Sequence, residues 1–429
     1  MLNKIFGTAS KLTLTTIIAV GSMLSVDSFA QDNEYVEEVV SIGTRGKPRS
    51  VSSSPVPVDV LSAEDISKTG TDDLLMQLQG SIPSLNVHLQ PISDAASMIR
   101  PANLRGLSAD STLITTNGKR RHHASVIAFQ GGGVNDGSQG ADISVIPAIA
   151  LKRVEVLRDG ASAQYGSDAI AGVINFVLDD ISEGGSLSYK MGEYTEGDGA
   201  TTTIAGKYGM PLGQDGFVTT SFQIRQADDT SRSAQRPDAA ALIAAGNAAV
   251  ANPAQIWGAP KIDDDVTFFM NSGVTNSDGS ESYMFGNYSE RDVDGGFYYR
   301  NPDGRSGVFT IGDYRAVGNV DGTCAYGTGA SGQVDPSDYA TTDLIMADPS
   351  CFLMNQIAPG GYTPRFTGNI TDTSLTIGRR GDISNGMLSG YTYDLSGSVG
   401  RNEADFGLNN TVNPSMGPDT PRNFDTGSY

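Results

Sequence analysis

Five adjacent basic or imidazole side chains stand together in a strongly acidic chain. The run Lys119-Arg120-Arg121-His122-His123 follows an Asn-Gly turn, and the formal net charge of the sequence is −20. Such side chains could contact an anionic or metal-bearing ligand, although a solvated charge run is an equally open alternative. Neighbouring histidines in a strand point to opposite faces, so we expect no metal here. Ligand contact is therefore predicted for Arg120, Arg121, His122 and His123.

No other group of residues indicates catalysis. The sequence has no GxSxG nucleophile elbow, no HExxH zinc motif and no phosphate-binding Walker loop. The glycines at 131–133 are predicted to form an apical loop, not a phosphate cradle. We therefore expect no enzyme activity, no catalytic residues and no cofactor.

The first thirty residues are predicted to be a signal peptide. Lys4 and Lys11 give a positive start, residues 12–26 are apolar, and Ser28 and Ala30 are small residues before a cleavage point. The apolar run is shorter than the roughly 20 residues that span a bilayer, which disfavours a membrane anchor. The mature chain is thus expected outside the cytoplasm.

The sequence contains two cysteines, Cys324 and Cys351. In an exported protein an even pair usually forms a disulfide, which here would close a large polar loop. The sequence has no CxxC spacing and no histidine near these cysteines, which argues against a metal or redox role. A disulfide is therefore predicted.

The composition favours many short strands and turns. There are 52 glycines and 16 tyrosines, and the acidic balance argues against nucleic acid and anionic membrane surfaces as partners. In 389–400, Tyr391, Leu395 and Val399 alternate with Asp394 and Ser398. This pattern is typical of a transmembrane barrel wall but also of a soluble β-sandwich. Similar strands are predicted at 186–192, 200–209, 216–225, 281–289 and 372–380.

The region before these strands reads as a compact α+β unit. Ser62 and Asp65 form a capping box that starts a helical turn, and Thr71 is predicted to cap the next helix. A strand at 111–115 leads into the Asn117-Gly118 turn.

The stretch from Ile143 to Leu178 reads as strand, glycine turn, short helix, glycine turn and strand. Its first strand carries Arg153, Glu155 and Arg158 among apolar residues. Charges in an apolar strand are costly unless they find partners. We therefore expect this strand to dock against a polar wall.

This stretch closely resembles the end of the plug domain of TonB-dependent outer-membrane receptors. The elements before it, including the Arg105-Gly106-Leu107 turn, occur in the family's order, although Thr116-Asn117-Gly118-Lys119 departs from the usual Asp-Gly turn. The resemblance implies an α+β plug domain followed by antiparallel transmembrane β-barrel strands. The expected organisation is a signal peptide at 1–30, a periplasmic linker at 31–54, the plug at 55–180, and a partial β-barrel with long extracellular loops at 181–429.

The resemblance also implies roles for particular residues. The extended segment of Glu37, Glu38, Val39, Val40, Ser41, Ile42 and Gly43 resembles a TonB box, which an unpaired strand would offer to TonB by β-augmentation. A plain disordered linker is the alternative. Arg105, Arg153, Glu155 and Arg158 are expected to pair with the barrel wall and hold the plug, whereas ordinary surface ion pairs would contribute only about 0–1 kcal/mol each.

The size of the chain leads to a further expectation. A barrel that holds a plug needs about 22 strands, which far exceeds the strands visible after residue 180. A fragment is therefore expected; a plug with a small oligomeric barrel is the alternative.

The expected function is active uptake of a scarce nutrient across the Gram-negative outer membrane. The partners implied are TonB with its inner-membrane energising complex, outer-membrane lipid, and a small-molecule or metal-chelate ligand such as a siderophore, cobalamin, haem or an oligosaccharide. The alternatives are a signalling receptor and a surface β-rich adhesion protein without transport.

Overall fold

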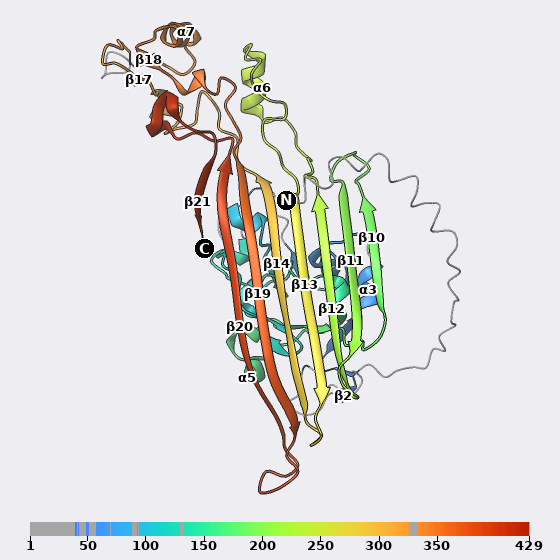
Figure 1. Ribbon diagram of the computed structural model, residues 1–429. Helices are drawn as coiled ribbons and strands as arrows, with labels where there is room; N and C mark the ends of the chain where they lie inside the picture. Colours follow the sequence, from blue (N-terminus) through green and yellow to red (C-terminus); the bar gives the residue numbers. More distant parts are fainter. Residues whose placement is uncertain are drawn as a thin grey trace, which may run out of the picture. The chain divides into compact units, whose positions relative to one another are not determined.

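The computed structural model describes residues 39–40, 42, 49–50, 57–68, 70–87, 92, 94–128, 133–326 and 333–428. Two large sheets dominate this part of the chain: a five-stranded sheet in the plug region and an eight-stranded antiparallel sheet after it (Figure 1). The predicted signal peptide lies outside the described residues.

The plug sheet has the strand order β3-β8-β9-β6-β7. β6 and β9 run parallel, and the other neighbouring pairs are antiparallel. The predicted strand-helix-strand at 143–178 is confirmed as β8, α5 and β9. The strands and this helix are β3 (Val58–Ser62), β6 (Thr112–Thr116), β7 (Lys119–Arg120), β8 (Leu151–Leu157), α5 (Ser162–Tyr165) and β9 (Gly172–Leu178).

Two short helices and a small hairpin complete the plug. Ser62 caps α3 (Ala63–Ser67) by accepting a hydrogen bond from the Asp65 amide, as predicted. The cap of α4 (Leu74–Ser81) is Asp73, whose side chain accepts from the Met76 amide, so the prediction of Thr71 was wrong by two residues. The hairpin consists of β4 (Leu85–Val87) and β5 (Ala102–Leu104).

The second sheet has the order β10-β11-β12-β13-β14-β19-β20-β21, and the strands that the structure describes do not close into a ring. It is an incomplete barrel wall. The strands are β10 (Gly185–Gly192), β11 (Thr201–Pro211), β12 (Gly216–Ala227), β13 (Lys261–Thr275), β14 (Glu281–Gly296), β19 (Arg365–Asp382), β20 (Thr392–Asn409) and β21 (Phe424–Ser428).

Neither β13 nor β21 is among the strands predicted from the sequence. β13 carries three consecutive aspartates at 263–265 and adjacent phenylalanines at 268–269, which hide the period of two. Its register shifts between Ile262 and Asp264, so the alternation restarts within the strand.

The connections differ between the two ends of this wall (Figure 1). One end, here the long-loop end, carries 193–200, 228–260, 297–364 and 410–423; the other, the short-turn end, carries 212–215, 276–280 and 383–391. An alanine-rich tract forms α6 (Pro237–Ala244) within one long loop, and α7 (Tyr339–Ala347) lies in the next. Outer-membrane barrels have short periplasmic turns and longer extracellular loops.

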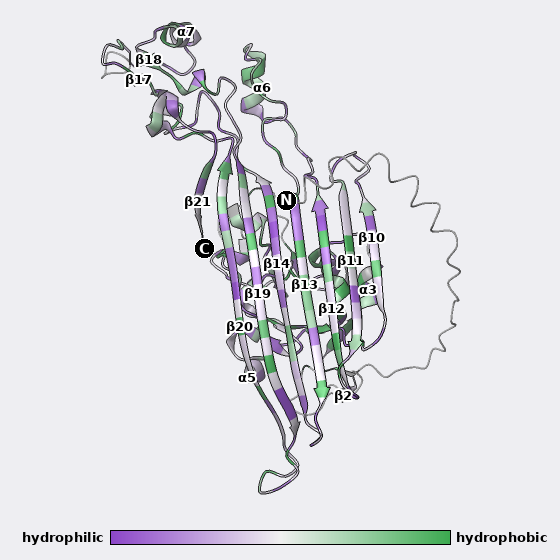
Figure 2. Cartoon of the chain, viewed as in Figure 1, coloured by the Kyte–Doolittle hydropathy of each residue, from purple (hydrophilic) through white to green (hydrophobic). Residues whose placement is uncertain are grey.

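The two faces of the wall have different surroundings. Leu187, Phe222, Phe268 and Tyr288 lie opposite one another on one face and are exposed. Figure 2 shows that hydrophobic and hydrophilic residues are interspersed along the strands of the wall. The opposite face places Phe269, Tyr283 and Phe285 in one core with the plug, including Leu75, Val154 and Ile174. None of the helices in the described ranges is long and apolar enough to cross a membrane.

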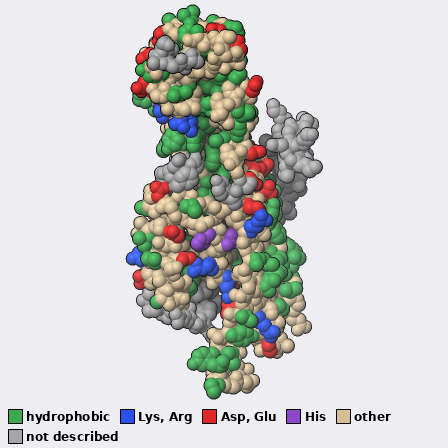
Figure 3. All heavy atoms as spheres, turned by 90° about the vertical axis from the view of Figure 1, so that its left-hand side faces the viewer, with side chains coloured by type: hydrophobic (Ala, Val, Ile, Leu, Met, Phe, Trp, Pro, Cys, Tyr) green, Lys and Arg blue, Asp and Glu red, His purple; other side chains and the backbone are tan. Residues whose placement is uncertain are grey.

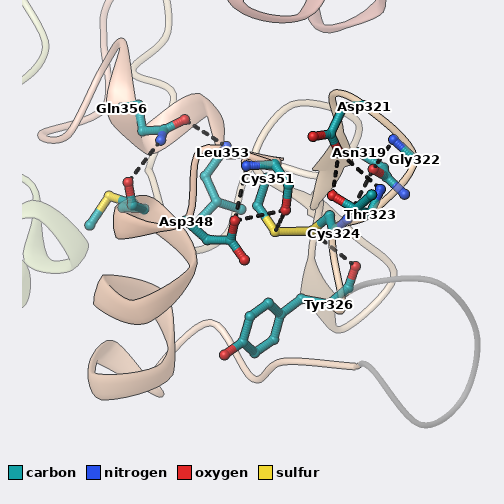
Figure 4. The surroundings of a disulfide bond; sticks show 12 residues. Asn319, Asp321, Gly322, Thr323, Cys324, Tyr326, Asp348, Cys351, Leu353 and Gln356 are labelled. Atoms are coloured by element: carbon teal, nitrogen blue, oxygen red, sulfur yellow. Dashed lines mark hydrogen bonds between the residues drawn. A yellow bond between two sulfur atoms is a disulfide. The ribbon is translucent and has the colours of Figure 1, made fainter.

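A disulfide links two described parts of the longest loop. Cys324 and Cys351 are bonded, as the sequence predicted, with their Cα atoms 5.0 Å apart (Figure 4). Both sulfurs belong to an apolar cluster with Val334, Ile345 and Leu353.

Replacing both cysteines by serine is expected to destabilise this loop by about 3–4 kcal/mol, because the bridge removes chain entropy from a closed loop of 27 residues. Hydrogen exchange should increase in peptides from 333–356 and stay unchanged in β19. Reduced wild-type protein is the matched control and should exchange like the variant. Unchanged exchange in both would mean that packing alone holds the loop.

Candidate functional site

The basic run lies at the interface between the plug and the wall. A tight turn positions it, since Asn117 and Gly118 both have positive φ angles, 49° and 75°. β7 then pairs back on β6, and the following residues pass along β14, β19 and β20. Figure 3 shows the histidines beside basic and acidic side chains on this side of the molecule.

Asp372 of β19 is the centre of this interface. Its carboxylate is 1% exposed and accepts from four side chains, two on each oxygen. Arg121 and His122 of the plug donate over 2.6 and 2.8 Å, and Asn287 and Asn402 of the wall over 2.8 and 3.0 Å. We call these five residues the Asp372 cluster. It joins one plug segment to three wall strands.

Lys119 makes a second contact nearer the short-turn end. Its ammonium group lies 2.8 Å from one carboxylate oxygen of Asp394. The other carboxylate oxygen accepts a hydrogen bond from the Tyr283 hydroxyl at 2.6 Å. Both Lys119 and Arg380 lie over the Tyr283 ring, an arrangement that favours the two cations. The polar face predicted for 389–400 is thus the face that meets the plug.

The structure places two of the four residues predicted to contact ligand, Arg121 and His122, against the wall. Arg121 and His122 both bind Asp372 of the wall, so they make plug–wall contacts in place of ligand contacts. Arg120 pairs with Asp168 within the plug, and His123 lies 3.9 Å from the same carboxylate. Ligand contact by Arg120 and His123, whose side chains are 47% and 46% exposed, stays a prediction.

The charges assigned to the wall are also placed differently. Arg153 pairs with Glu155 at 2.7 Å, and the fully buried Glu155 accepts from Asn175 on the neighbouring strand. Arg158 pairs with Asp59 of β3. β8 lies between β3 and β9, so these partners come from within the plug sheet.

The fourth residue of that set also finds its contact inside the plug. Arg105 is exposed, and its guanidinium lies 3.5 Å from the Ala171 carbonyl oxygen. The expected pairing of Arg105, Arg153, Glu155 and Arg158 with the wall is therefore corrected to contacts within the plug.

The TonB-box-like segment is partly outside the described residues, which include Val39, Val40 and Ile42 but not Glu37, Glu38, Ser41 or Gly43. Val39–Val40 (β1) pairs with Arg49–Ser50 (β2), and Val40 and Ile42 are buried in a plug cluster. The expectation of an unpaired segment is wrong for this state.

The wall contributes a contact that sequence reasoning missed. Arg291 of β14, which is 5% exposed, donates to the Met98 carbonyl at 2.9 Å and lies 3.5 Å from the Asp142 carboxylate of the plug. The feature that could have revealed this contact is an arginine in a strand that faces a buried surface, because a buried arginine needs a partner. Plug and wall thus hold each other through buried arginines from both sides.

A cavity of about 440 Å³ lies between the plug and the wall near the long-loop end. Plug residues 72–74, 97–100 and 144–146 contribute to it, together with β11 to β14 and the loop residues Tyr194 and Trp257. Pockets of this volume hold small-molecule ligands in other proteins. Among the described residues, no group of three or more His, Cys, Asp or Glu side chains is arranged to hold a metal ion.

Acidification is expected to weaken the plug at Asp73. Burial acts to raise the pKa of this carboxyl, but Arg100, and to a smaller extent Arg225, outweigh it, so the pKa lies below its usual value. Because the pKa of this carboxyl is lower in the folded state than in the unfolded state, its ionised form stabilises the fold at pH values above the unfolded pKa of about 3.9. This stabilisation is lost as the pH falls through the pKa of the folded state.

Asp73→Asn should remove the contribution of this carboxyl to the pH dependence of plug stability. The measurement is hydrogen exchange of α4 peptides between pH 7 and pH 3, corrected for intrinsic rates. Asp73→Ser is the matched control, since it keeps an N-cap oxygen without the charge. A pH slope that survives in both variants would assign the acid sensitivity to other groups.

Comparison with known proteins assigns the plug. A family model described as the TonB-dependent receptor plug domain matches residues 50–173. The iron-regulated outer membrane virulence protein of Vibrio cholerae is 29% identical over 161 residues, which is 37% of this chain and 23% of that protein. The ferric enterobactin receptor PirA of Pseudomonas aeruginosa is 28% identical over 175 residues, 39% of this chain and 23% of that protein. The match thus spans less than a quarter of these relatives.

Solved structures resemble a larger part of the chain at low sequence identity. The ferric enterobactin receptor PfeA of Pseudomonas aeruginosa covers 82% of this chain with 15% identity and a TM-score of 0.44, over 46% of its own length. The siderophore receptor PirA of Acinetobacter baumannii gives 14% identity and a TM-score of 0.43. The plug region of this chain is thus similar in sequence to the plug domains of TonB-dependent receptors.

Proposed function

We propose that the protein takes up a small ligand across the Gram-negative outer membrane, with energy supplied through TonB. The observation that carries the proposal is a plug of the receptor family packed through a polar interface against a barrel wall. The wall lies in the outer membrane, where its exposed apolar face contacts lipid. The function is uptake and not catalysis.

The polarity of the wall supports a direction of transport. The long loops face the outside, and the cavity beside Tyr194 and Trp257 lies near this end. The β1–β2 segment belongs to the plug's own N-terminal region, from which a periplasmic partner pulls. Ligand enters at the cavity, and force on the N-terminal segment loosens the plug.

Iron chelates are the ligand class that the related proteins favour, since one is named as iron-regulated and another as a ferric enterobactin receptor. Cobalamin, haem and oligosaccharides are the other candidates. Growth of a deletion strain on single iron sources, with and without TonB, tests both the transport and its energy source. Growth that depends on the protein but not on TonB would overturn the proposal.

A backbone variant tests the predicted TonB segment. Val40→Pro removes the amide that a partner strand needs, and it should abolish uptake while the amount in the outer membrane stays normal. Val40→Ala is the matched control because it shortens the same buried side chain and keeps the amide. Equal loss of uptake in both variants would mean that packing of residue 40, and not strand pairing with TonB, is what matters.

A further inference from the structure

The cavity near the long-loop end carries charges that are almost all paired. Seven charged side chains line it. Five have partners: Asp72 with Lys190, Asp73 with Arg100, Arg232 with Asp198, and Arg291 with Asp142. The remaining two are Arg225 and Asp265, for which the described part of the chain provides neither a hydrogen bond nor an ion pair.

These two side chains are neighbours on the wall. Arg225 of β12 stands directly opposite Asp265 of β13, and both line the cavity. Side chains at such paired positions have Cβ atoms about 4.5–5.5 Å apart. The two charges thus face each other, with Asp73 also near Arg225 and Arg291 also near Asp265, but no hydrogen bond or close ion pair fixes either side chain.

Burial makes this arrangement costly without a ligand. Asp265 is 4% exposed, and the Nε atom of Arg225 is buried without an acceptor. Burying a charge or a hydrogen-bond donor without a close partner destabilises a protein. Complementary groups on a ligand, a cation at Asp265 and an anion at Arg225, would satisfy both residues.

The rest of the cavity is suited to an apolar body. The indole of Trp257 lies at the loop side, with Ile146 of the plug and Val293 of the wall among the other lining residues. Aromatic side chains contribute large contact areas in such pockets. A ligand for this cavity thus combines two opposite charges with an apolar or aromatic group.

We propose that this cavity binds an amino-acid-like zwitterion, with its ammonium group at Asp265, its carboxylate at Arg225 and an apolar or aromatic side chain against Trp257. The group is carried by a free amino acid or forms one end of a larger chelate. The inference rests on the proposed uptake function and specifies its ligand. A triscatecholate trianion fits less well, because the four arginines and three aspartates that line the cavity sum to only one positive charge.

Tryptophan fluorescence provides the binding measurement, since Trp257 is the single tryptophan of the sequence. The detergent-solubilised protein is titrated with L-phenylalanine, N-acetyl-L-phenylalanine, L-phenylalaninamide, and a ferric hydroxamate that ends in a free α-amino acid. We expect the first and last probes to change the fluorescence. Loss of either charge in the capped probes should weaken binding by about tenfold or more. Tighter binding of the chelate than of phenylalanine identifies the chelate as the source of the zwitterion.

Two variants test the residues. Asp265→Asn and Arg225→Gln should each weaken binding of the zwitterionic probes by about tenfold or more. Asp264→Asn is the matched control, because Asp264 is the next residue of β13 and accepts from Gln226 instead of lining the cavity. It should bind like wild type. Trp257→Phe should abolish the signal.

The outcomes separate this inference from the uptake function. Binding of ferric enterobactin that is unaffected by Asp265→Asn, with no response to the zwitterions up to about 10 mM, would overturn the inference and leave TonB-dependent uptake standing. Equal affinity for phenylalanine and its capped forms would also overturn it. TonB-independent growth in the deletion strain would instead remove the uptake function.

Discussion

Asp372→Ala should release the plug segment at 119–123 from the wall. The substitution leaves the Arg121 guanidinium buried without its carboxylate partner, and it removes the acceptor of His122 as well. Breaking a buried pair by deleting one partner costs about 3–5 kcal/mol. Hydrogen exchange of peptides from residues 112–128 and from β19 should therefore increase by about two orders of magnitude or more.

Two further variants define the cause. Asp405→Ala removes an exposed aspartate from the neighbouring strand β20 and should leave exchange unchanged. Arg121→Leu combined with Asp372→Leu removes both charges, and it should recover much of the loss because a hydrophobic replacement of a buried pair is often neutral or stabilising. If Asp372→Ala exchanged like wild type at 119–123, the Asp372 cluster would not be what holds the plug.

The same variant has an expected phenotype in cells. A plug that opens more often should admit antibiotics that are too large for ordinary porins. Sensitivity to vancomycin should therefore rise with Asp372→Ala and stay at the wild-type level with Asp405→Ala. Increased sensitivity that requires TonB would indicate force-driven opening, whereas TonB-independent sensitivity would indicate spontaneous loosening.

The sequence predicted the local elements well because their signals are short in range. The cap at Ser62, the Asn117-Gly118 turn and the two strands around α5 depend on residues a few positions apart. The alternation at 389–400 likewise placed Asp394 on the plug side of the wall. Each of these features needs only the chemistry of one turn or one strand.

The roles of the charged residues could not be predicted in the same way. Asp372 lies 251 positions from Arg121 in the sequence, and no local pattern connects them. A charge in an apolar strand needs a partner, which led to the prediction that Glu155 meets the wall; its partners are instead Arg153 on the same strand and Asn175 on the next. Asn175, a polar residue inside an apolar run and directly opposite Glu155, was the signal that could have found it.

The cavity was the least predictable feature of the site. Arg225 and Asp265 meet only because β12 and β13 pair in one register, and β13 was not predicted at all. Its three consecutive aspartates interrupt the alternation by which a strand is predicted. Residues whose partners depend on strand register become visible only once the register is known.

Gly172→Ala is expected to disrupt the plug at the motif by which the family was recognised. Gly172 begins β9 with φ at 151°, and a Cβ atom there would lie 2.2 Å from the Leu157 carbonyl oxygen and 2.9 Å from the Leu104 side chain. The carbonyl belongs to the backbone of β8 and cannot move alone. Strain of this kind should destabilise the plug by about 3 kcal/mol or more.

The expected consequence is localised, and a nearby glycine provides the control. Exchange should increase in peptides covering β8 and β9, while β13 and β14 in the wall stay protected. Gly160→Ala places its Cβ 3.5 Å from the nearest atom, the Ile170 carbonyl oxygen, which is an ordinary contact. This variant should change stability by no more than about 0.5 kcal/mol. Equal exchange in the two variants would show that the close approach of β9 to β8 at Gly172 is not what the glycine provides, and the motif would then owe its glycine to a step after folding, such as opening of the plug.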